Sequence, residues 1–132
     1  MSAEAMSAEE SPARCILVVD DDPMVRMLLQ EFLTELGHAV VVAENGLQAI
    51  DAFHRLGSSI RLLVTDLHMP LMDGASLIRR IRQLDEHLPI AVITGYADDS
   101  MLQAVQQQVT VLIKKPVRFS ELQSLAGLMR DA

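Results

Sequence analysis

The stretch that decides the fold is Cys-Ile-Leu-Val-Val-Asp-Asp-Asp-Pro at residues 15–23. It joins a continuous apolar run to an acidic cluster, and the proline follows where a helix can begin. An apolar run without alternating polar residues is typical of a strand covered on both faces, as in a parallel sheet with crossover helices. The stretch therefore predicts a buried strand over Cys15–Val19 with charged side chains at its carboxyl end.

The same alternation of apolar runs with helical periodicity continues along the chain. The predicted strands are Cys15–Val19, Ala39–Ala43, Leu62–Thr65, Ile90–Thr94 and Val109–Ile113. Each is followed by a helical pattern, and these patterns begin near Pro23, Asn45, Asp73, Asp98 and Ser120. We therefore expect one α/β domain over residues 14–132, built as a doubly wound, five-stranded parallel sheet of (βα)₅ type.

Apolar residues at helical spacing define the inward face of each predicted helix. In chain order these residues are Val25, Leu28, Leu29, Phe32 and Leu36; Leu47, Ile50 and Phe53; Leu77, Ile78 and Ile81; Met101, Leu102 and Val105; and Leu122, Leu125, Ala126 and Met129. We expect Asp22 and Asp73 to cap their helices, and Ser120 with Gln123 to form a capping box at the last one.

Composition limits the classes of function. There are 11 Lys and Arg residues against 18 Asp and Glu residues, and the formal net charge of −7 argues against a nucleic-acid partner. No apolar run exceeds five residues, far short of the ~20 that a membrane-spanning helix needs. Residues 1–13 are acidic and lack an apolar core, so we expect a disordered leader without a targeting signal. The single Cys15 fits the core of a cytoplasmic protein.

Polar residues gather where the predicted strands end, which is where ligands of an open parallel sheet bind. These residues are Asp20, Asp21 and Asp22 after the first strand, Asp66 after the third, Thr94 at the end of the fourth and Lys115 after the fifth. Several carboxylates at one edge repel one another unless a cation lies among them, which implies a divalent ion such as Mg²⁺. An ionised aspartate beside such an ion, a hydroxyl and an ammonium has the groups needed to accept a phosphoryl group.

Four motifs in order resemble the receiver domain of two-component response regulators. They are Val-Val-Asp-Asp-Asp-Pro at 18–23, Val-Thr-Asp-Leu-His-Met-Pro-Leu-Met-Asp-Gly at 64–74, Ile-Thr-Gly at 93–95 and Lys-Lys-Pro at 114–116. The resemblance implies a flavodoxin-like receiver fold and a stand-alone phosphoacceptor switch, which catalyses only its own phosphorylation and dephosphorylation. It also implies a histidine kinase or phosphotransfer protein upstream.

The resemblance assigns a role to each residue at the strand ends. Asp66 is the phosphoacceptor, Asp21 binds Mg²⁺ directly, and Asp20 binds it largely through water, with the backbone carbonyl of His68 as a further ligand. Asp66 itself also contributes to the metal site.

The same resemblance gives the remaining site residues their roles. Thr94 hydrogen-bonds a phosphoryl oxygen and draws in the loop at 95–97, while Lys115 pairs with the phosphoryl group and has a cis bond to Pro116. A partner then reads the state on the face formed by the fourth helix, the fifth strand and the fifth helix.

The sequence departs from the family pattern near this output face. Leu112 stands where an aromatic switch residue is usual, and Tyr96 is the residue that could take part of that role. Gln107–Gln108–Val109 replaces a small Gly-Ala turn, so we expect a distorted or mobile exit from the fourth helix. His68 lies where it could tune attack by water on the phosphoryl group.

Two other functions stay open. One is a pseudo-receiver that binds partners independently of phosphorylation, which the altered Leu112 region favours. The other is an aspartate-nucleophile phosphohydrolase starting at Asp20–Asp22, which is disfavoured because Met24 replaces the threonine of its Asp-x-Asp-x-Thr motif and no cap domain is present. We expect a monomer, because no extended apolar stripe is left once the core is assigned.

Overall fold

The computed structural model describes residues 14–95 and 99–130. The strands are β1 (Cys15–Val19), β2 (Val40–Ala43), β3 (Ile60–Thr65), β4 (Ile90–Thr94) and β5 (Val111–Lys114). They form one parallel sheet in the order β2-β1-β3-β4-β5. The helices are α1 (Pro23–Glu35), α2 (Gly46–Leu56), α3 (Gly74–Leu84), α4 (Asp99–Val105) and α5 (Phe119–Ala126), with a short 3₁₀ helix η3 (Gly57–Ser59). The predicted doubly wound α/β fold is confirmed.

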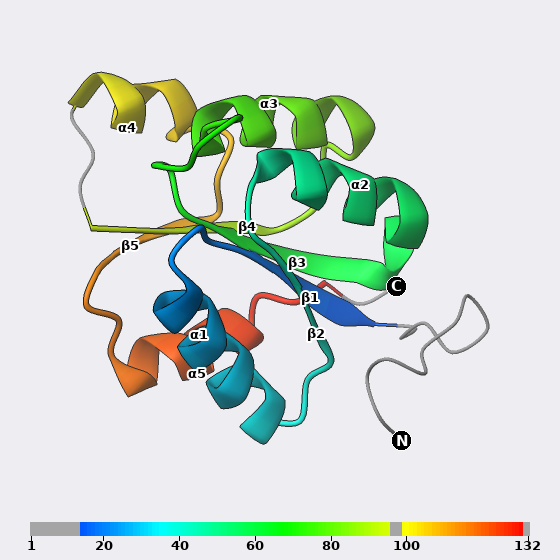
Figure 1. Ribbon diagram of the computed structural model, residues 1–132, viewed down its shortest axis with the longest axis vertical. Coiled ribbons are helices and arrows are strands. Elements are labelled where there is room, and N and C mark those ends of the chain that lie inside the picture. Colours follow the sequence, from blue (N-terminus) through cyan, green and yellow to red (C-terminus); the bar gives the residue numbers. More distant parts are fainter. Residues whose placement is uncertain (1–13, 96–98, 131–132) are drawn as a thin grey trace.

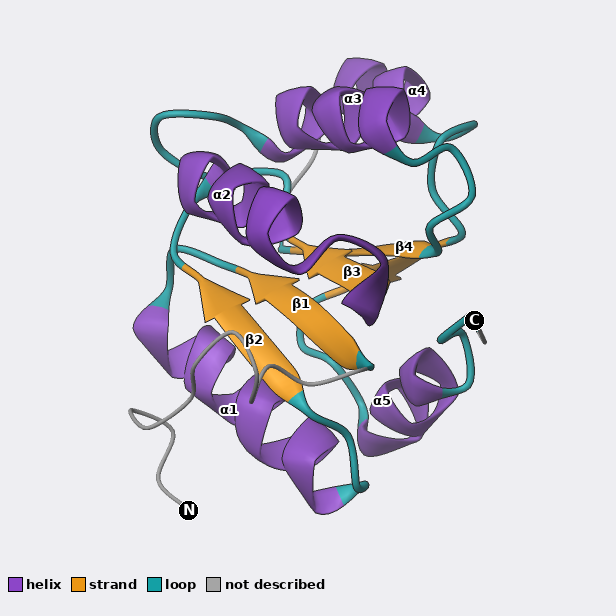
Figure 2. Ribbon diagram, turned by 90° about the vertical axis from the view of Figure 1, so that its right-hand side faces the viewer, coloured by secondary structure: helices purple, strands orange, loops and turns teal. Residues whose placement is uncertain are grey.

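The sheet separates two apolar cores. Helices α1 and α5 cover one face, and α2, α3 and α4 cover the other (Figures 1 and 2). Because successive strand residues point to opposite faces, Ile16 packs in the core under α1 and α5, while Leu17 packs in the core under α2 and α3. Strand β1 is buried along its whole length, as its unbroken apolar run predicts, whereas Val42 of the edge strand β2 is 37% exposed.

Side-chain caps start three of the helices. The carboxylates of Asp22 and Asp73 accept from the backbone N–H groups of Met24 at 2.9 Å and Ser76 at 2.8 Å. The Asn45 side chain accepts from Gln48 N at 2.9 Å and begins α2. The two predicted aspartate caps are therefore confirmed.

One predicted cap and several predicted boundaries are wrong, since β2 begins at Val40 rather than Ala39 and β3 at Ile60 rather than Leu62. The predicted Ser120–Gln123 capping box does not form, because the N-cap of α5 is Arg118, two residues before Ser120, and the Glu121 carboxylate instead accepts from Arg118 N at 2.9 Å. Strand β5 begins at Val111 rather than Val109, since Val109 belongs to the connection from α4 and packs partly buried against the core.

The inward faces of two helices also differ from the predicted ones. Leu28 is 49% exposed and Leu47 is 52% exposed, while Leu33 is fully buried in place of Leu28. Together with Met24 and Met27, Leu28 leaves exposed apolar side chains on α1. The premise of the monomer expectation, that no apolar stripe remains, is therefore wrong for this helix.

Two arginines form hydrogen bonds that connect segments near the amino ends of β3 and β4. Arg82, near the end of α3, donates from Nε and Nη2 to the Gln108 carbonyl at 3.0 and 2.6 Å, and from Nη1 to the Leu88 carbonyl at 2.7 Å. Its partners anchor the turn at 106–108, where the regular helix α4 has ended. Arg130 pairs with the Asp85 carboxylate at 2.5 Å and donates to the Ile60 carbonyl at 3.2 Å.

Some predicted features lie outside the described residues. These are the leader at 1–13, Tyr96, and the start of the fourth helix at Asp98. In the described parts of the chain, no helix combines the length and apolar character that crossing a membrane requires.

Candidate functional site

The carboxyl edge of the sheet brings the predicted site residues together. Strands β1 and β3 are neighbours with Val19 opposite Thr65, so the next residues, Asp20 and Asp66, emerge side by side. Thr94 ends the adjacent strand β4 and is 3% exposed. The parallel topology therefore places the acidic residues and the threonine at one edge, as expected from the sequence.

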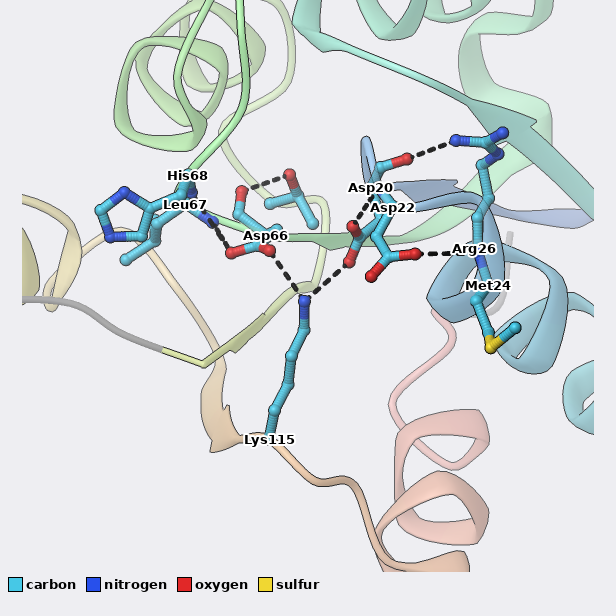
Figure 3. A network of polar contacts seen from close by, with 9 residues as sticks. Asp20, Asp22, Met24, Arg26, Asp66, Leu67, His68 and Lys115 are labelled. Carbon is cyan, nitrogen blue, oxygen red and sulfur yellow. Dashed lines mark hydrogen bonds and ion pairs between the residues drawn. The ribbon is translucent and has the colours of Figure 1, made fainter.

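Lys115 joins the two buried carboxylates. Its Nζ lies 2.9 Å from Oδ2 of Asp66 and 3.1 Å from Oδ2 of Asp20 (Figure 3). The preceding Lys114 is exposed, as expected for a neighbour that faces the other way. The Lys115–Pro116 peptide is cis, as the resemblance implied, and the Lys115 N–H donates to the Thr94 carbonyl at 3.0 Å.

Backbone groups of the β3–α3 loop fix the other oxygen of Asp66. Its Oδ1 accepts from the N–H groups of Leu67 at 2.6 Å and His68 at 3.2 Å. The loop can come this close because Gly74 lies against it: a Cβ on Gly74 would be 2.2 Å from the Asp66 carbonyl oxygen. Asp66 is consequently 6% exposed, with one oxygen held by the backbone and the other by Lys115.

Asp20 is held equally firmly. Its Oδ1 accepts from Asp22 N at 2.9 Å, and its backbone carbonyl accepts from Nη1 of Arg26 at 2.7 Å. Burial raises the pKa of the Asp20 carboxyl above its usual value, although the Asp22 N–H and Lys115 act in the opposite direction.

The same contacts act on Lys115. Burial lowers the pKa of its ammonium group, but the hydrogen bonds and charges of Asp66 and Asp20 outweigh that effect and raise the pKa overall. The ammonium group therefore stays charged at neutral pH between the two carboxylates.

The acidic residues fit a hard divalent cation. Asp20, Asp21 and Asp66 each offer a carboxylate oxygen, and these oxygens lie within 4.8 Å of one another. Asp21 is exposed, so one side of the cluster is open to water. Mg²⁺ is suited to such a site because it binds one or two carboxylates and retains several water ligands. The carbonyl of His68 as a further ligand stays a prediction.

Of the two predicted switch positions, the structure describes Leu112. It is half-buried and packs against the core under α2, α3 and α4, and its role stays a prediction. Sequence reasoning missed Arg26, which contacts the Asp20 carbonyl. The only available signal was a basic residue one turn into a helix that begins beside the acidic cluster.

Comparison with known proteins identifies the class. The chain matches the response regulator receiver domain over residues 16–126. It therefore belongs to the receiver-domain family of two-component and phosphorelay systems, with the flavodoxin-like receiver fold. Members of this family are signalling domains rather than conventional enzymes, and they generally bind Mg²⁺ at an acidic pocket.

Some of the relatives are about as long as this chain. An uncharacterized 14.6 kDa protein in the sodA1 3′ region of Leptolyngbya boryana is 42% identical over 110 residues, covering 81% of this chain and 82% of its own. The sporulation initiation phosphotransferase F of Bacillus subtilis is 35% identical over 88 residues, covering 67% and 69%. A crystal structure of a response regulator receiver protein from Pseudomonas putida superposes with a TM-score of 0.80 at 30% identity, covering 89% of this chain and 98% of that one.

The family also occurs inside larger proteins. The chain spans only 13% of the length of the sensor kinases LuxN and RcsC, which it also matches.

Proposed function

We propose that this protein is a phosphoacceptor switch that receives a phosphoryl group on Asp66 and changes its binding to other proteins. The observation that carries the proposal is the Lys115 ammonium between the Asp66 and Asp20 carboxylates, at 2.9 and 3.1 Å. A nucleophilic carboxylate, a fixed cation and a nearby hydroxyl from Thr94 are the groups that phosphoryl transfer needs. Membership of the receiver family supports the same assignment.

The proposed phosphoryl transfer needs only that the reacting groups lie in the right positions. In the proposed reaction an oxygen of Asp66 forms a bond to phosphorus while the phosphorus–nitrogen bond of a phosphohistidine breaks. The electron pair of that bond stays on the leaving imidazole, which takes up a proton from water. Asp66 needs no general base, because a carboxylate is already ionised at neutral pH.

The remaining site residues would stabilise the acceptor. Bound Mg²⁺ would supply positive charge to the phosphoryl oxygens, and Asp20, Asp21 and Asp66 would hold it. Lys115 would pair with a phosphoryl oxygen in place of Oδ2 of Asp66, and Thr94 would hydrogen-bond another. His68 is exposed two residues beyond Asp66, where its side chain could affect the approach of water and thus the rate of dephosphorylation.

The proposal extends to partners and context. We propose that the protein is cytoplasmic and that a histidine kinase or phosphotransfer protein is its upstream donor. The sensor kinases and the phosphotransferase among the relatives support a phosphorelay setting. We also propose that residues 14–132 form the receiver domain, that 1–13 is a leader, and that α4, β5 and α5 present the output face near Leu112.

The test is intact-mass spectrometry after incubation with phosphoramidate, a donor with a phosphorus–nitrogen bond, with and without Mg²⁺. We expect one added phosphoryl group in the wild type, none in Asp66→Asn, and wild-type labelling in the control Asp51→Asn, which changes an exposed acid on α2. Labelling of Asp66→Asn to the wild-type extent would overturn the assignment of Asp66. Failure of wild type to accept phosphate both from phosphoramidate and from a phosphotransfer protein would favour the pseudo-receiver.

A further inference from the structure

Arg26 is a charged side chain that points at the acidic site without belonging to it. It lies near the start of α1, and its Nη1 donates to the backbone carbonyl of Asp20 at 2.7 Å (Figure 3). Its Nη2 lies 3.8 Å from Oε1 of Glu44, and the Arg26 side chain is 17% exposed. Most of the guanidinium group is thus committed to contacts at the ends of β1 and β2.

The carbonyl that Arg26 binds lies just beyond the last residue of β1. The N–H of Asp20 still donates to the Ala43 carbonyl of β2 at 3.2 Å, but β1 itself ends at Val19. The same carbonyl belongs to the peptide group that joins Asp20 to Asp21. Because a peptide group is planar, a contact that orients this carbonyl also orients the backbone from which both carboxylates project.

The other partner of Arg26 is held in place as well. The Glu44 N–H donates to Oε1 of Gln48 at 2.9 Å, and Nε2 of Gln48 donates to Oε2 of Glu44 at 3.3 Å. Gln48 also donates its backbone N–H to Asn45 at the start of α2. Arg26 is therefore fixed between the β1–α1 loop and the β2–α2 loop, where Gln48 of the first turn of α2 holds Glu44.

From these contacts we infer that Arg26 is a positioning residue that orients the Asp20–Asp21 peptide so that both carboxylates face the proposed Mg²⁺ site. The inference rests on the proposed function, since it concerns the same acidic cluster. It makes a counterintuitive prediction about the metal. A cation near the cluster repels Mg²⁺, so a pure field effect would make removal of Arg26 tighten Mg²⁺ binding, whereas loss of a positioning contact would weaken it.

The experiment measures Mg²⁺ binding by isothermal titration calorimetry on the full chain, without any phosphodonor. In Arg26→Gln we expect Mg²⁺ binding to weaken about tenfold, the lower end for loss of a group that orients metal ligands. Arg26→Lys, which keeps the charge and one possible donor, should fall between this variant and wild type. Arg79→Gln removes an exposed arginine of α3 and should bind Mg²⁺ as wild type does.

A second variant separates the two contacts of Arg26. Glu44→Gln removes the charge partner but leaves the Asp20 carbonyl contact, so its Mg²⁺ affinity should stay within about twofold of wild type, as expected for an exposed, loosely paired ion contact. Thermal unfolding of each variant checks that it is folded at the titration temperature. Tighter or unchanged Mg²⁺ binding in Arg26→Gln would overturn the inference.

Failure of this inference differs from failure of the proposed function. If the wild type binds no Mg²⁺, the proposed metal site is wrong, and the role of Arg26 falls with it. If the wild type binds Mg²⁺ and is labelled on Asp66, but Arg26→Gln binds Mg²⁺ equally well, only the positioning role of Arg26 is wrong.

Discussion

At Asp20 the stability of the fold and the binding of a cation favour different protonation states. Burial disfavours the charged carboxylate and raises its pKa, yet a cation site needs that charge. A group whose pKa is raised in the folded state stabilises the fold while it is protonated, and this contribution is lost as pH rises through the raised pKa. The ionised Asp20 therefore lowers the stability of the fold at neutral pH.

Asp20→Asn should raise the melting temperature at pH 7 by a few degrees, the shift that about 1 kcal/mol produces in a domain of this size. Lys115 keeps Asp66 as a partner in this variant. The gain should shrink as pH falls from the raised pKa of Asp20 towards the ordinary carboxyl value, because wild-type Asp20 is then protonated in the folded state, and no gain should remain below that value. Calorimetric unfolding of both proteins from pH 7 to acid measures this, and a lower melting temperature for Asp20→Asn at pH 7 would contradict it.

Gly74 lies where the neighbouring backbone leaves no room for a side chain. A Cβ there would be 2.2 Å from the Asp66 carbonyl oxygen and 2.6 Å from Leu67 Cα, both backbone atoms that cannot rotate away. Gly74→Ala should destabilise the fold by about 1–3 kcal/mol, as overpacking does, and should reduce labelling of Asp66 by displacing its loop. The control is Gly95→Ala, whose Cβ would meet Lys115 Cδ at 3.7 Å, an ordinary contact. Equal melting temperatures for the two variants would disprove the steric argument.

At the scale of the elements, one side chain holds the turn that follows α4. Helix α4 is short, spanning Asp99–Val105, and the turn after it is bound through the Gln108 carbonyl to Arg82. Burial lowers the pKa of the Arg82 guanidinium, so its hydrogen bonds offset a desolvation cost. Arg82 thus connects the end of α3 to the entry of β5.

Arg82→Met, which keeps the apolar stem and removes the hydrogen bonds, should loosen this turn. We expect amide hydrogen exchange over 106–110 to accelerate at least about tenfold, corresponding to about 1.4 kcal/mol of lost local stability. Exchange in β1 should not change, since β1 lies two strands away from β4. Arg79→Met, which loses only a contact to Ser76 at 3.2 Å, is the matched control. Unchanged exchange over 106–110 would show that the turn is held by other contacts.

The sequence predicts helices and strands correctly where burial of apolar side chains is the dominant effect. The apolar runs of β1 and β4 are buried on both faces and have the predicted bounds. Where weaker forces compete, the prediction failed: Ser120 and Gln123 match a capping pattern, but Glu121, two residues before Gln123, makes the contact with Arg118 instead. On α2, Leu47 has the correct spacing for the core yet lies in the first turn of the helix and is 52% exposed.

For the whole molecule, the contact between Arg130 and Asp85 joins the end of the described chain to the α3–β4 connection. The Arg130 hydrogen bond is the main cause that lowers the pKa of the Asp85 carboxyl, against the effect of burial. A carboxyl whose pKa is depressed in the folded state stabilises the fold above its unfolded-state pKa, and this contribution disappears as pH falls through the depressed value.

Asp85→Asn should therefore lower stability at pH 7 by about 1.5–3 kcal/mol, the range for a hydrogen bond to a charged group. The difference from wild type should vanish once acid has protonated Asp85 in both states. Urea unfolding at several pH values measures the free energy of unfolding. A double-mutant cycle with Arg130→Gln tests whether the two side chains act as a pair, and a difference that persists at low pH would exclude this origin.

The site was predictable because topology alone brings strand ends together. Asp20, Asp66 and Lys115 follow different strands, and a parallel sheet places all these ends at one edge. The long polar side chains that support the site were not predictable. Arg26, Arg82 and Arg130 all donate to backbone carbonyls, and a sequence does not reveal which carbonyls the fold leaves within their reach.

The burial of Cys15 has a practical consequence for experiments on this protein. It is the only cysteine of the chain, it is fully buried, and burial raises the pKa of its thiol to about 11. The thiolate is the nucleophile that attacks thiol-reactive dyes, so the native protein should resist labelling at neutral pH. A cysteine introduced on the surface of α4 or α5 would then be a unique attachment point, and fluorescence could follow the proposed output face without removal of the native residue.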